Sequence, residues 1–469
     1  MNSVTAAALI GAALTIPLTA VIPVRARVFL HIGAGVAFYG LLAGTGSLAA
    51  LIGAALAVHA IAFGMHRARA ASRRYLLCAG VVISLAPLLA TRIGPRPDAW
   101  ISGVGVSFFA FQAIAYLVDL AQGSCRQPAS LRELLFLLFF FPRVLQGPLE
   151  RTAGFLSQVP ALGRASYEQW RVGLVLIAWG LVKKIVVADR IGLLVDSVYG
   201  NSQAFPATVQ WLAVVGFAFQ IYADFSGYTD MARGAARICG LAIAQNFDRP
   251  YMSVSIADFW RRWHISLSQW LLAYLFMPFQ RAFSGRSAAS YAASVIGTFV
   301  ICGAWHGAGW TFVLWGLLNG VWLALNRWTE PGRNQLASRL GVPADLRRIW
   351  RMGMTFLMVC AAWALFRAES VTQAAQIWGA LPDAILGWRT GLKACLSLVT
   401  SLYGRFDLTM LVLGLGALIA VDIGRGYTRI AGAWAIQSAP LRWAVYYLLI
   451  IGAVIGYTPA SRPFIYFRF

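Results

Sequence analysis

The sequence predicts an all-α integral membrane protein that crosses the bilayer many times. Hydrophobic residues make up 59% of the 469 residues and charged residues only 12%, with a mean hydropathy of +0.68. A soluble globular domain does not have this composition. Uncharged stretches long enough to span about 30 Å of hydrocarbon recur along the chain. We therefore expect roughly ten to thirteen membrane helices.

The expected spans begin in a Gly- and Ala-rich opening, residues 6–57, whose small side chains allow close helix packing in lipid. The first apolar segment has no Lys or Arg before it and is followed by Arg25 and Arg27. We therefore expect a first membrane helix and not a cleaved signal. The long uncharged stretches are 4–24, 28–65 (enough for two crossings), 101–118, 205–223, 288–326 (again two) and 443–461. Shorter runs at 75–90, 352–366 and 408–421 add spans or partly inserted helices.

The organisation along the chain favours one integral membrane domain over residues 1–469, because no low-complexity linker and no internal repeat is visible. Residues 1–102 form its Gly- and Ala-rich part. From about Gly103 onward, aromatic and polar residues interrupt the apolar runs. We expect the chemistry in this later part, 103–469.

The charge is strongly basic, with 39 Lys and Arg against 17 acidic residues and a net charge of +22. In a soluble protein this excess would suggest nucleic acid as a partner. In a membrane protein, arginine instead gathers in cytoplasmic loops and contacts anionic lipid headgroups. We therefore expect the bilayer and no nucleic acid as a partner, with the arginine-rich loops 67–74 and 333–351 both in the cytoplasm.

The six cysteines predict neither a metal site nor a disulfide framework. They are scattered, and no two have Cys-x-x-Cys spacing. We therefore expect no bound metal.

His306 is the first candidate for catalysis among only five histidines. It lies in the middle of the uncharged run 288–326, where a ring that can take up and return a proton is costly to place. The sequence on either side is about one crossing long, so residues 305–308 are predicted at a turn between two helices. Glycines around the turn allow close approach of a ligand. We expect the ring at the start of the following helix, where the dipole keeps it neutral, as a general base requires.

His264 is the second candidate, in the segment 258–279. This segment is long enough to cross the membrane but carries several charged and polar residues, which would be unfavourable in lipid by roughly several kcal/mol. We expect it to lie along the interface or to enter a protein-lined cavity as a broken or re-entrant helix. On a helix, His264 and Ser268 would lie one turn apart on one face, so the histidine is expected to face the protein.

These residues and several flanking motifs resemble the membrane-bound O-acyltransferase (MBOAT) family, in particular its bacterial branch for alginate O-acetylation. The resemblance covers roughly Gly103 to the C-terminus, and several ordered motifs are more specific than either histidine motif alone. The matching pieces are Gly105-Val-Ser-Phe-Phe-Ala-Phe-Gln through Asp119, Phe141-Pro-Arg-Val-Leu-Gln-Gly-Pro148, Gly180-Leu-Val-Lys-Lys184 through Arg190, Tyr222-Ala-Asp-Phe-Ser-Gly-Tyr-Thr-Asp-Met231, Phe259 to Ser268, Ala304-Trp-His-Gly307, Leu365 to Glu369 and Pro463-Phe-Ile-Tyr-Phe.

The resemblance implies a helical bundle with re-entrant segments and a central funnel, and O-acyltransferase activity. In that family, the histidine of the Trp-His-Gly motif is taken as catalytic, which maps onto His306, and the second polar position maps onto His264. Two departures bear on the acceptor and leave both histidines in place. Residues 276–281 lack the Gly-Asn-Arg that usually follows the proline of that segment, and Gln146-Gly147-Pro148 stands where the alginate branch usually has Ala-Gly-Pro.

The function expected is transfer of an acetyl or other acyl group from a cytoplasmic thioester, acetyl-CoA or an acyl carrier, for O-acetylation of an exopolysaccharide such as alginate. No bound cofactor is needed. A hydroxyl attacks poorly until its proton is removed, so His306 is expected to be the base and His264 to orient the acceptor or stabilise the oxyanion. Because CoA is too charged to cross the bacterial inner membrane, the site is expected in a polar funnel reached from both faces.

The remaining site residues are predicted by their chemistry. Arg261 and Arg262 either contact lipid headgroups or bind the phosphates of the donor, and Trp305 and Ser268 are expected to contact substrate. Asp224 and Asp230 are expected in a structural network, with Arg233, Arg237 or Arg249 as available partners. Lys183 and Lys184 are expected to snorkel.

A periplasmic partner is also expected. The resemblance implies one, because the alginate branch works with transferases of the serine-hydrolase type. After the re-entrant segment and the His306 turn, no stretch is long and polar enough for a domain with a sugar-binding cleft. Within the family, the alternatives are transfer of D-alanine or another acyl group to teichoic acid, and acetylation of peptidoglycan or cellulose. From another class, a proton-coupled transporter also suits broken helices with intramembrane His and Asp.

Overall fold

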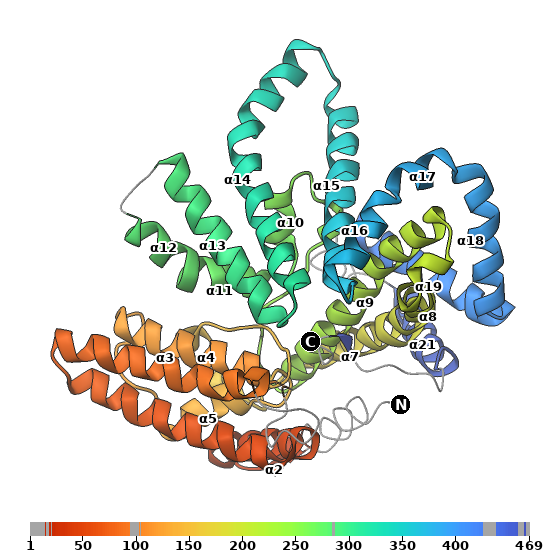
Figure 1. Cartoon of the computed structure of the whole chain (residues 1–469). Coiled ribbons are helices and arrows are strands. Elements are labelled where there is room, and N and C mark those ends of the chain that lie inside the picture. The colour runs from red at the N-terminus through yellow and green to blue at the C-terminus, as the bar shows by residue number, and fades with distance from the viewer. Residues whose placement is uncertain are drawn as a thin grey trace. The chain divides into compact units, whose positions relative to one another are not determined.

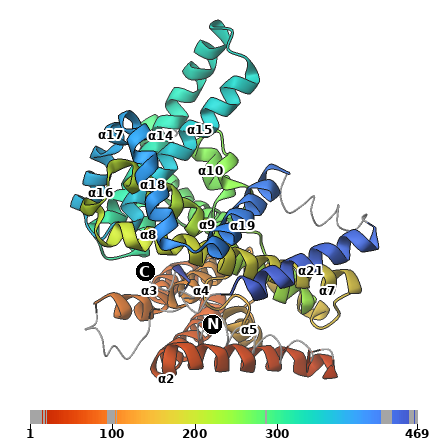
Figure 2. The same ribbon diagram turned by 90° about the vertical axis from the view of Figure 1, so that its right-hand side faces the viewer.

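The computed structural model describes residues 15, 18–19, 21–93, 103, 105–283, 287–424, 438–457 and 464–465. These residues form helices joined by short connections, and the described part of the chain contains no strand (Figures 1 and 2). The predicted all-α membrane fold is confirmed. The chain divides into two compact units, which we describe separately.

Unit 1 comprises Met1–Gly180, Tyr228–Gln245 and Ser461–Arg468. Four of its helices pack together, and the longest of them, α2, is interrupted at Gly44, which has a left-handed φ of 83°. Gly35 permits close packing of α2, because a Cβ there would overlap the carbonyl group of Phe139. The helices are α2 (Val24–Arg67), α3 (Ala70–Ile93), α4 (Val106–Ala121), α5 (Leu131–Phe139), α6 (Thr152–Leu156), η1 (Val159–Ala161) and most of α7 (Tyr167–Val182).

Unit 2 comprises Leu181–Gly227 and Asn246–Ala460, with Phe469. It contains both candidate histidines. Its helices are η2 (Lys183–Ala188), α8 (Asp189–Gly200), η3 (Ser202–Ala204), most of α9 (Ala207–Ile238), η4 (Pro250–Met252), α10 (Ile256–Arg262), α11 (Ile265–Leu271), η5 (Leu272–Phe276), α12 (Met277–Ala282), α13 (Ala288–His306), α14 (Trp310–Arg339), α15 (Ala344–Arg367), α16 (Val371–Gly379), α17 (Leu381–Leu386), α18 (Trp388–Leu402), α19 (Arg405–Ile423) and α21 (Ala439–Ile455).

Helices α13, α14 and α15 form the part of unit 2 that positions His306 (Figure 1). Glycines bring α13 and α14 into close contact: a Cβ on Gly303 would overlap the carbonyl group of Phe312, and a Cβ on Gly316 would overlap that of Phe299. Close backbone approach at small residues is the usual mode of helix packing in lipid. As a result, the end of α13 is held against the start of α14.

The predicted spans correspond to helices in most cases. Five described helices are long and apolar enough to cross a membrane, within Arg25–Arg67, Ala70–Thr91, Ala288–His306, Ala344–Arg367 and Arg405–Ile423. Helices α4 and α21, from the predicted spans 101–118 and 443–461, are apolar but shorter. The first predicted span, 4–24, falls largely outside the described residues, and the expected number of crossings stays a prediction.

Two predicted boundaries were wrong. The span 205–223 is only the first part of α9, which continues to Ile238. The arginine-rich stretch 333–351 is not a loop, because α14 extends to Arg339 and α15 begins at Ala344. Helical hydrogen bonding continues through the charged residues, since arginine is a good helix former.

Candidate functional site

The segment that carries His264 is a broken helix, as predicted. Helix α10 ends at Arg262, and α11 begins at Ile265. Between them His264 has φ 43° and ψ 54°, a left-handed conformation that costs energy for a non-glycine residue. The expectation that His264 and Ser268 share one helical face is wrong, because the left-handed backbone turns His264 out of the helix.

Asn246 holds this break in place, and the sequence analysis missed it. Its backbone carbonyl accepts a hydrogen bond from the N–H of Ile265 at 2.9 Å. Its side-chain oxygen accepts one from the N–H of Ser266 at 3.2 Å. The N–H groups in the first turn of a helix have no acceptor within that helix. The N–H groups of Ile265 and Ser266 belong to the first turn of α11. Asn246 therefore caps α11 from another part of the chain.

The His264 side chain is buried, with 1% of its surface exposed. The rings of His264 and Phe225 are nearly perpendicular, with centroids 4.6 Å apart. The preceding residue, Trp263, lies 5.0 Å from Trp363 of α15. The prediction that His264 faces the protein is confirmed.

His306 is the last residue of α13, and Gly307 to Gly309 connect it to α14. The predicted turn is confirmed. The predicted place of the ring at the start of a helix is wrong: His306 lies at the carbonyl end of α13, where the helix dipole favours positive charge. The dipole therefore gives no reason for a neutral ring.

An aromatic cage surrounds His306, which is 5% exposed. Its ring centroid lies 4.4 Å from that of Trp305, 5.3 Å from Trp315 and 5.1 Å from Phe366. Trp363 joins this cage to the other histidine, since it stacks on Trp315 at 6.1 Å and contacts Trp263 at 5.0 Å. The structure thus brings both predicted catalytic residues into one aromatic cluster of unit 2.

The two predicted arginines differ in their surroundings. The Arg261 side chain is 71% exposed and the Arg262 side chain 26% exposed, and both pair with Asp258, at 3.4 Å and 3.0 Å. Burial alone would raise the pKa of Asp258, but hydrogen bonds from the Arg262 side chain and the Val254 N–H, with the charges of both arginines, hold it below its usual range. Asp258 is therefore an anion that orients Arg262.

The other predicted substrate contacts lie beside the histidines. Trp305 is half-buried and contacts His306. The Ser268 hydroxyl donates to the carbonyl of Trp263 at 3.2 Å, and its N–H donates to the carbonyl of His264 at 2.9 Å. Ser268 therefore supports the backbone of the broken helix, in addition to any contact with substrate.

The predicted network around Asp224 exists but has a different partner. Lys184, from η2, lies 2.7 Å from Asp224 and 2.8 Å from Asp189, and all three side chains are almost fully buried. Lys183 donates to the Ser226 hydroxyl at 2.9 Å. These lysines are buried and paired, so the expectation that they snorkel is wrong.

Asp230 belongs to unit 1. It lies 3.5 Å from Arg233, one of the partners that the sequence predicted.

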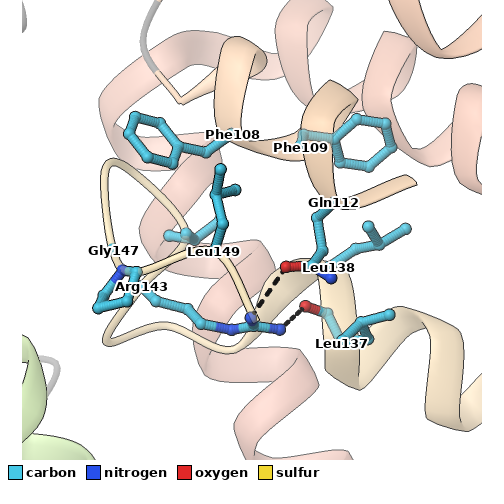
Figure 3. Close-up of a pocket in the computed structure, with 10 residues that line it drawn as sticks. Phe108, Phe109, Gln112, Leu137, Leu138, Arg143, Gly147 and Leu149 are labelled. Carbon is cyan, nitrogen blue, oxygen red and sulfur yellow. Dashed lines mark hydrogen bonds between the residues drawn. The ribbon is translucent and has the colours of Figure 1, made fainter. Parts of the chain in front are cut away.

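In unit 1, two of the family-like motifs meet around Arg143 (Figure 3). The Arg143 guanidinium donates to the side-chain oxygen of Gln112 at 3.2 Å and to the carbonyl of Leu137. Gln112 also binds both backbone groups of Glu150, at 2.8 and 3.1 Å. The buried loop 140–149 is therefore fixed to α4 by these side chains. Only a small cavity of about 20 Å³ remains beside them, enough for about one water molecule.

The comparisons agree with the resemblance predicted from the motifs. Residues 120–334 match the model of MBOAT, the membrane-bound O-acyltransferase family. The chain is 33% identical to a probable alginate O-acetylase of Azotobacter vinelandii over 281 residues, 59% of this chain and 53% of the relative. It is 31% identical to a probable alginate O-acetylase of Pseudomonas aeruginosa over 338 residues, 67% of this chain and 61% of the relative.

A third relative is named for a different polymer. The chain is 32% identical to a peptidoglycan O-acetyltransferase of Helicobacter pylori over 302 residues, 58% of this chain and 55% of the relative. The matches cover between 53% and 61% of the length of these three relatives.

Proposed function

We propose that this chain, whose residues 120–334 match the model of the membrane-bound O-acyltransferase family, is an O-acetyltransferase acting on an extracellular polysaccharide. The observation that carries the proposal is the pair of buried histidines, His264 and His306, within one aromatic cluster of unit 2. A structural role alone gives no reason for two titratable rings in such surroundings. Buried titratable side chains of this kind are typical of catalytic sites.

The proposed reaction starts from a thioester. The acceptor hydroxyl oxygen attacks the thioester carbonyl carbon while the His306 ring takes the hydroxyl proton. The tetrahedral intermediate then collapses, the carbon–sulfur bond breaks, and the thiolate leaves. The imidazolium returns its proton to this thiolate, so the ring ends neutral and no cofactor is consumed.

His264 is proposed to orient the acceptor hydroxyl or to donate a hydrogen bond to the oxyanion. Fixed donors that await charge in the transition state contribute strongly in a site without water. The left-handed backbone at His264 and its cap at Asn246 support this role. Strain of this kind is kept where the surroundings enforce it, and it is frequent at functional sites.

The donor is proposed to reach the site from the cytoplasm and the acceptor from the opposite side of a bacterial inner membrane that the chain crosses several times. Arginine-rich helix ends at Arg67 and around residues 333–351 support the cytoplasmic assignment. A charged thioester cannot cross the bilayer, so a polar funnel must connect the histidines with both faces.

The acceptor is proposed to be alginate or a related exopolysaccharide, with peptidoglycan as the second candidate because one relative is named for it. We also propose that the acyl group passes first to the serine hydroxyl of a periplasmic transferase. The short connection after His306 supports this relay, since only residues 307–309 join α13 to α14.

Reconstitution in liposomes tests the proposal, with a labelled acetyl thioester inside and alginate or peptidoglycan outside. Labelled polymer, or labelled transferase when the partner is added, is the expected result. Proton-coupled uptake without any thioester turnover would favour a transporter instead. Full-rate acetylation of the polymer with no second protein would refute the relay and leave the acetyltransferase intact.

A further inference from the structure

Asn319 is a buried amide in α14 that the proposed reaction does not use. Its side chain is 2% exposed, and it lies one turn after Trp315 on the same helix. A buried amide without hydrogen-bond partners costs free energy. An asparagine in these surroundings is therefore expected to have specific partners, and both of its polar atoms have one.

The two polar atoms of the amide contact two helices that pack together, α10 and α14 (Figure 1). The Oδ1 atom of Asn319 accepts a hydrogen bond from the indole N–H of Trp260, in α10, at 3.1 Å. Its Nδ2 atom donates to the backbone carbonyl of Trp315, in α14 itself, at 2.9 Å. Because the amide oxygen only accepts and the amide nitrogen only donates, a flip of the amide would lose both bonds. Asn319 therefore fixes the Trp260 indole at one point of α14.

Each of these tryptophans lies beside one of the candidate histidines. The Trp315 ring contacts the His306 ring, with centroids 5.3 Å apart. Trp260 lies in α10, which ends at Arg262, two residues before the left-handed His264. The Trp260 ring also packs against that of Trp315, with centroids 5.8 Å apart. The hydrogen bond of Asn319 thus connects the helix that leads to His264 with the cage of His306.

We propose that Asn319 is a positioning residue that sets the His264 break relative to the His306 ring, an inference that rests on the proposed acyltransferase reaction. In that reaction, one ring takes the hydroxyl proton and the other orients the acceptor or the oxyanion, so both must reach the same reacting carbon. A misplacement of about 1 Å can cost about a hundredfold in rate. Aromatic rings pack at a range of centroid distances, whereas a hydrogen bond has narrow limits of distance and angle. Asn319 adds such a directional contact to the aromatic cluster.

Two substitutions remove this bond, one from each side. Asn319→Leu keeps a side chain of similar shape without the polar atoms, and Trp260→Phe keeps an aromatic ring without the N–H donor. Each is expected to lower kcat for acyl transfer about ten- to a hundredfold. KM for the thioester is expected to stay unchanged, because the two rings move relative to each other and no contact with the donor is removed. The double variant is expected to be no slower than the slower single variant, since both changes break one bond.

The same helix offers a matched control for the amide. Asn326 donates to Glu330 at 3.3 Å and accepts from Arg333 at 2.8 Å, outside the aromatic cluster. Asn326→Leu therefore also removes a hydrogen-bonded amide from α14 and is expected to keep a normal kcat. Trp328→Phe, at a residue that is 48% exposed, is the corresponding control for the indole.

A second measurement needs no turnover. Nuclear magnetic resonance of the full chain in nanodiscs, with isotope-labelled tryptophan and histidine, records the Trp260 indole N–H and both histidine rings. Loss of the bond in Asn319→Leu is expected to shift the indole signal and the ring signals of His264 and His306. The Asn326→Leu control is expected to shift none of them.

Three results would overturn the proposal. The first is a near-normal kcat in both single variants, and Trp260→Phe decides this point alone if Asn319→Leu does not fold. The second is a double variant whose loss of kcat is the product of the two single losses, because the two residues would then act independently. The third is a shifted indole signal with unmoved histidine signals, because the bond would then hold α10 without positioning the rings.

The two measurements also separate this inference from the proposed function. Shifted histidine signals in Asn319→Leu, in a protein whose unmodified form turns over no thioester, would refute the acyltransferase and leave the positioning contact. Unmoved signals and full turnover in Asn319→Leu would refute the positioning role and leave the acyltransferase.

Discussion

The side chain of Asn246 caps helix α11 by accepting the N–H of Ser266 at 3.2 Å, and its backbone carbonyl accepts the N–H of Ile265 at 2.9 Å. Since α11 directly follows His264, this contact fixes where the histidine leaves its helix. The geometry of the candidate site therefore depends on a residue outside every histidine motif.

We expect Asn246→Ala to destabilise the protein by about 1 kcal/mol, the usual cost of a lost helix cap, and to lower acyl transfer. The change removes the side-chain acceptor and leaves the backbone bond in place. Thermal unfolding in detergent and the rate of transfer measure the two effects. Asn201→Ala, at an exposed position, is the control. Equal losses of stability and of transfer rate in both variants would refute the capping role of Asn246.

His306→Ala is expected to lower acyl transfer about 10²- to 10⁴-fold, the usual effect of losing a general base. Expression and melting temperature should change little, because the aromatic cage remains. His264→Ala should cost less activity. The exposed His66→Ala serves as the matched control, and near-normal turnover of the His306 variant would eliminate the proposed mechanism.

His264→Gly and His264→Ala together separate backbone strain from chemistry. Glycine adopts the left-handed conformation freely, whereas alanine keeps the Cβ that makes it costly by roughly 1–2 kcal/mol. We expect the glycine variant to be the more stable of the two and both to have equally low activity. Recovery of activity in the glycine variant would mean that the ring has no role in transfer.

Local features of the site were predictable from the sequence, and long-range partners were not. The turn after His306 followed from the length of the uncharged run and its glycines. The break before Ile265 was predictable because the segment 258–279 carries several charged and polar residues. The cap at Asn246 lies 18 residues before His264, and no periodicity marks such a contact. Likewise Lys184 pairs with Asp224 although 40 residues separate them. The sequence alone does not show that Asp224 pairs with this lysine and not with an arginine nearer in sequence.

Lys184→Met is expected to destabilise unit 2 strongly, by about 3–5 kcal/mol, because it leaves Asp224 and Asp189 buried without their shared cation. The exposed Lys393→Met should be nearly neutral. Chemical or thermal unfolding of both variants measures the difference. A loss of less than about 1 kcal/mol at Lys184, the value typical of exposed pairs, would show that the carboxylates are solvated in the membrane-embedded protein.

The two arginine-rich helix ends should both face the cytoplasm, since short connections rich in arginine are retained on that side. Single cysteines at Arg69 and Arg339, in a background without the six native cysteines, are expected to resist an impermeant thiol reagent in intact cells. Both should react after the cells are opened. Labelling of Arg339→Cys from outside would refute the cytoplasmic assignment of the helix ends around residues 333–351. If only Arg69→Cys is labelled from outside, the number of membrane crossings in unit 1 differs from the number that the arginine distribution predicts.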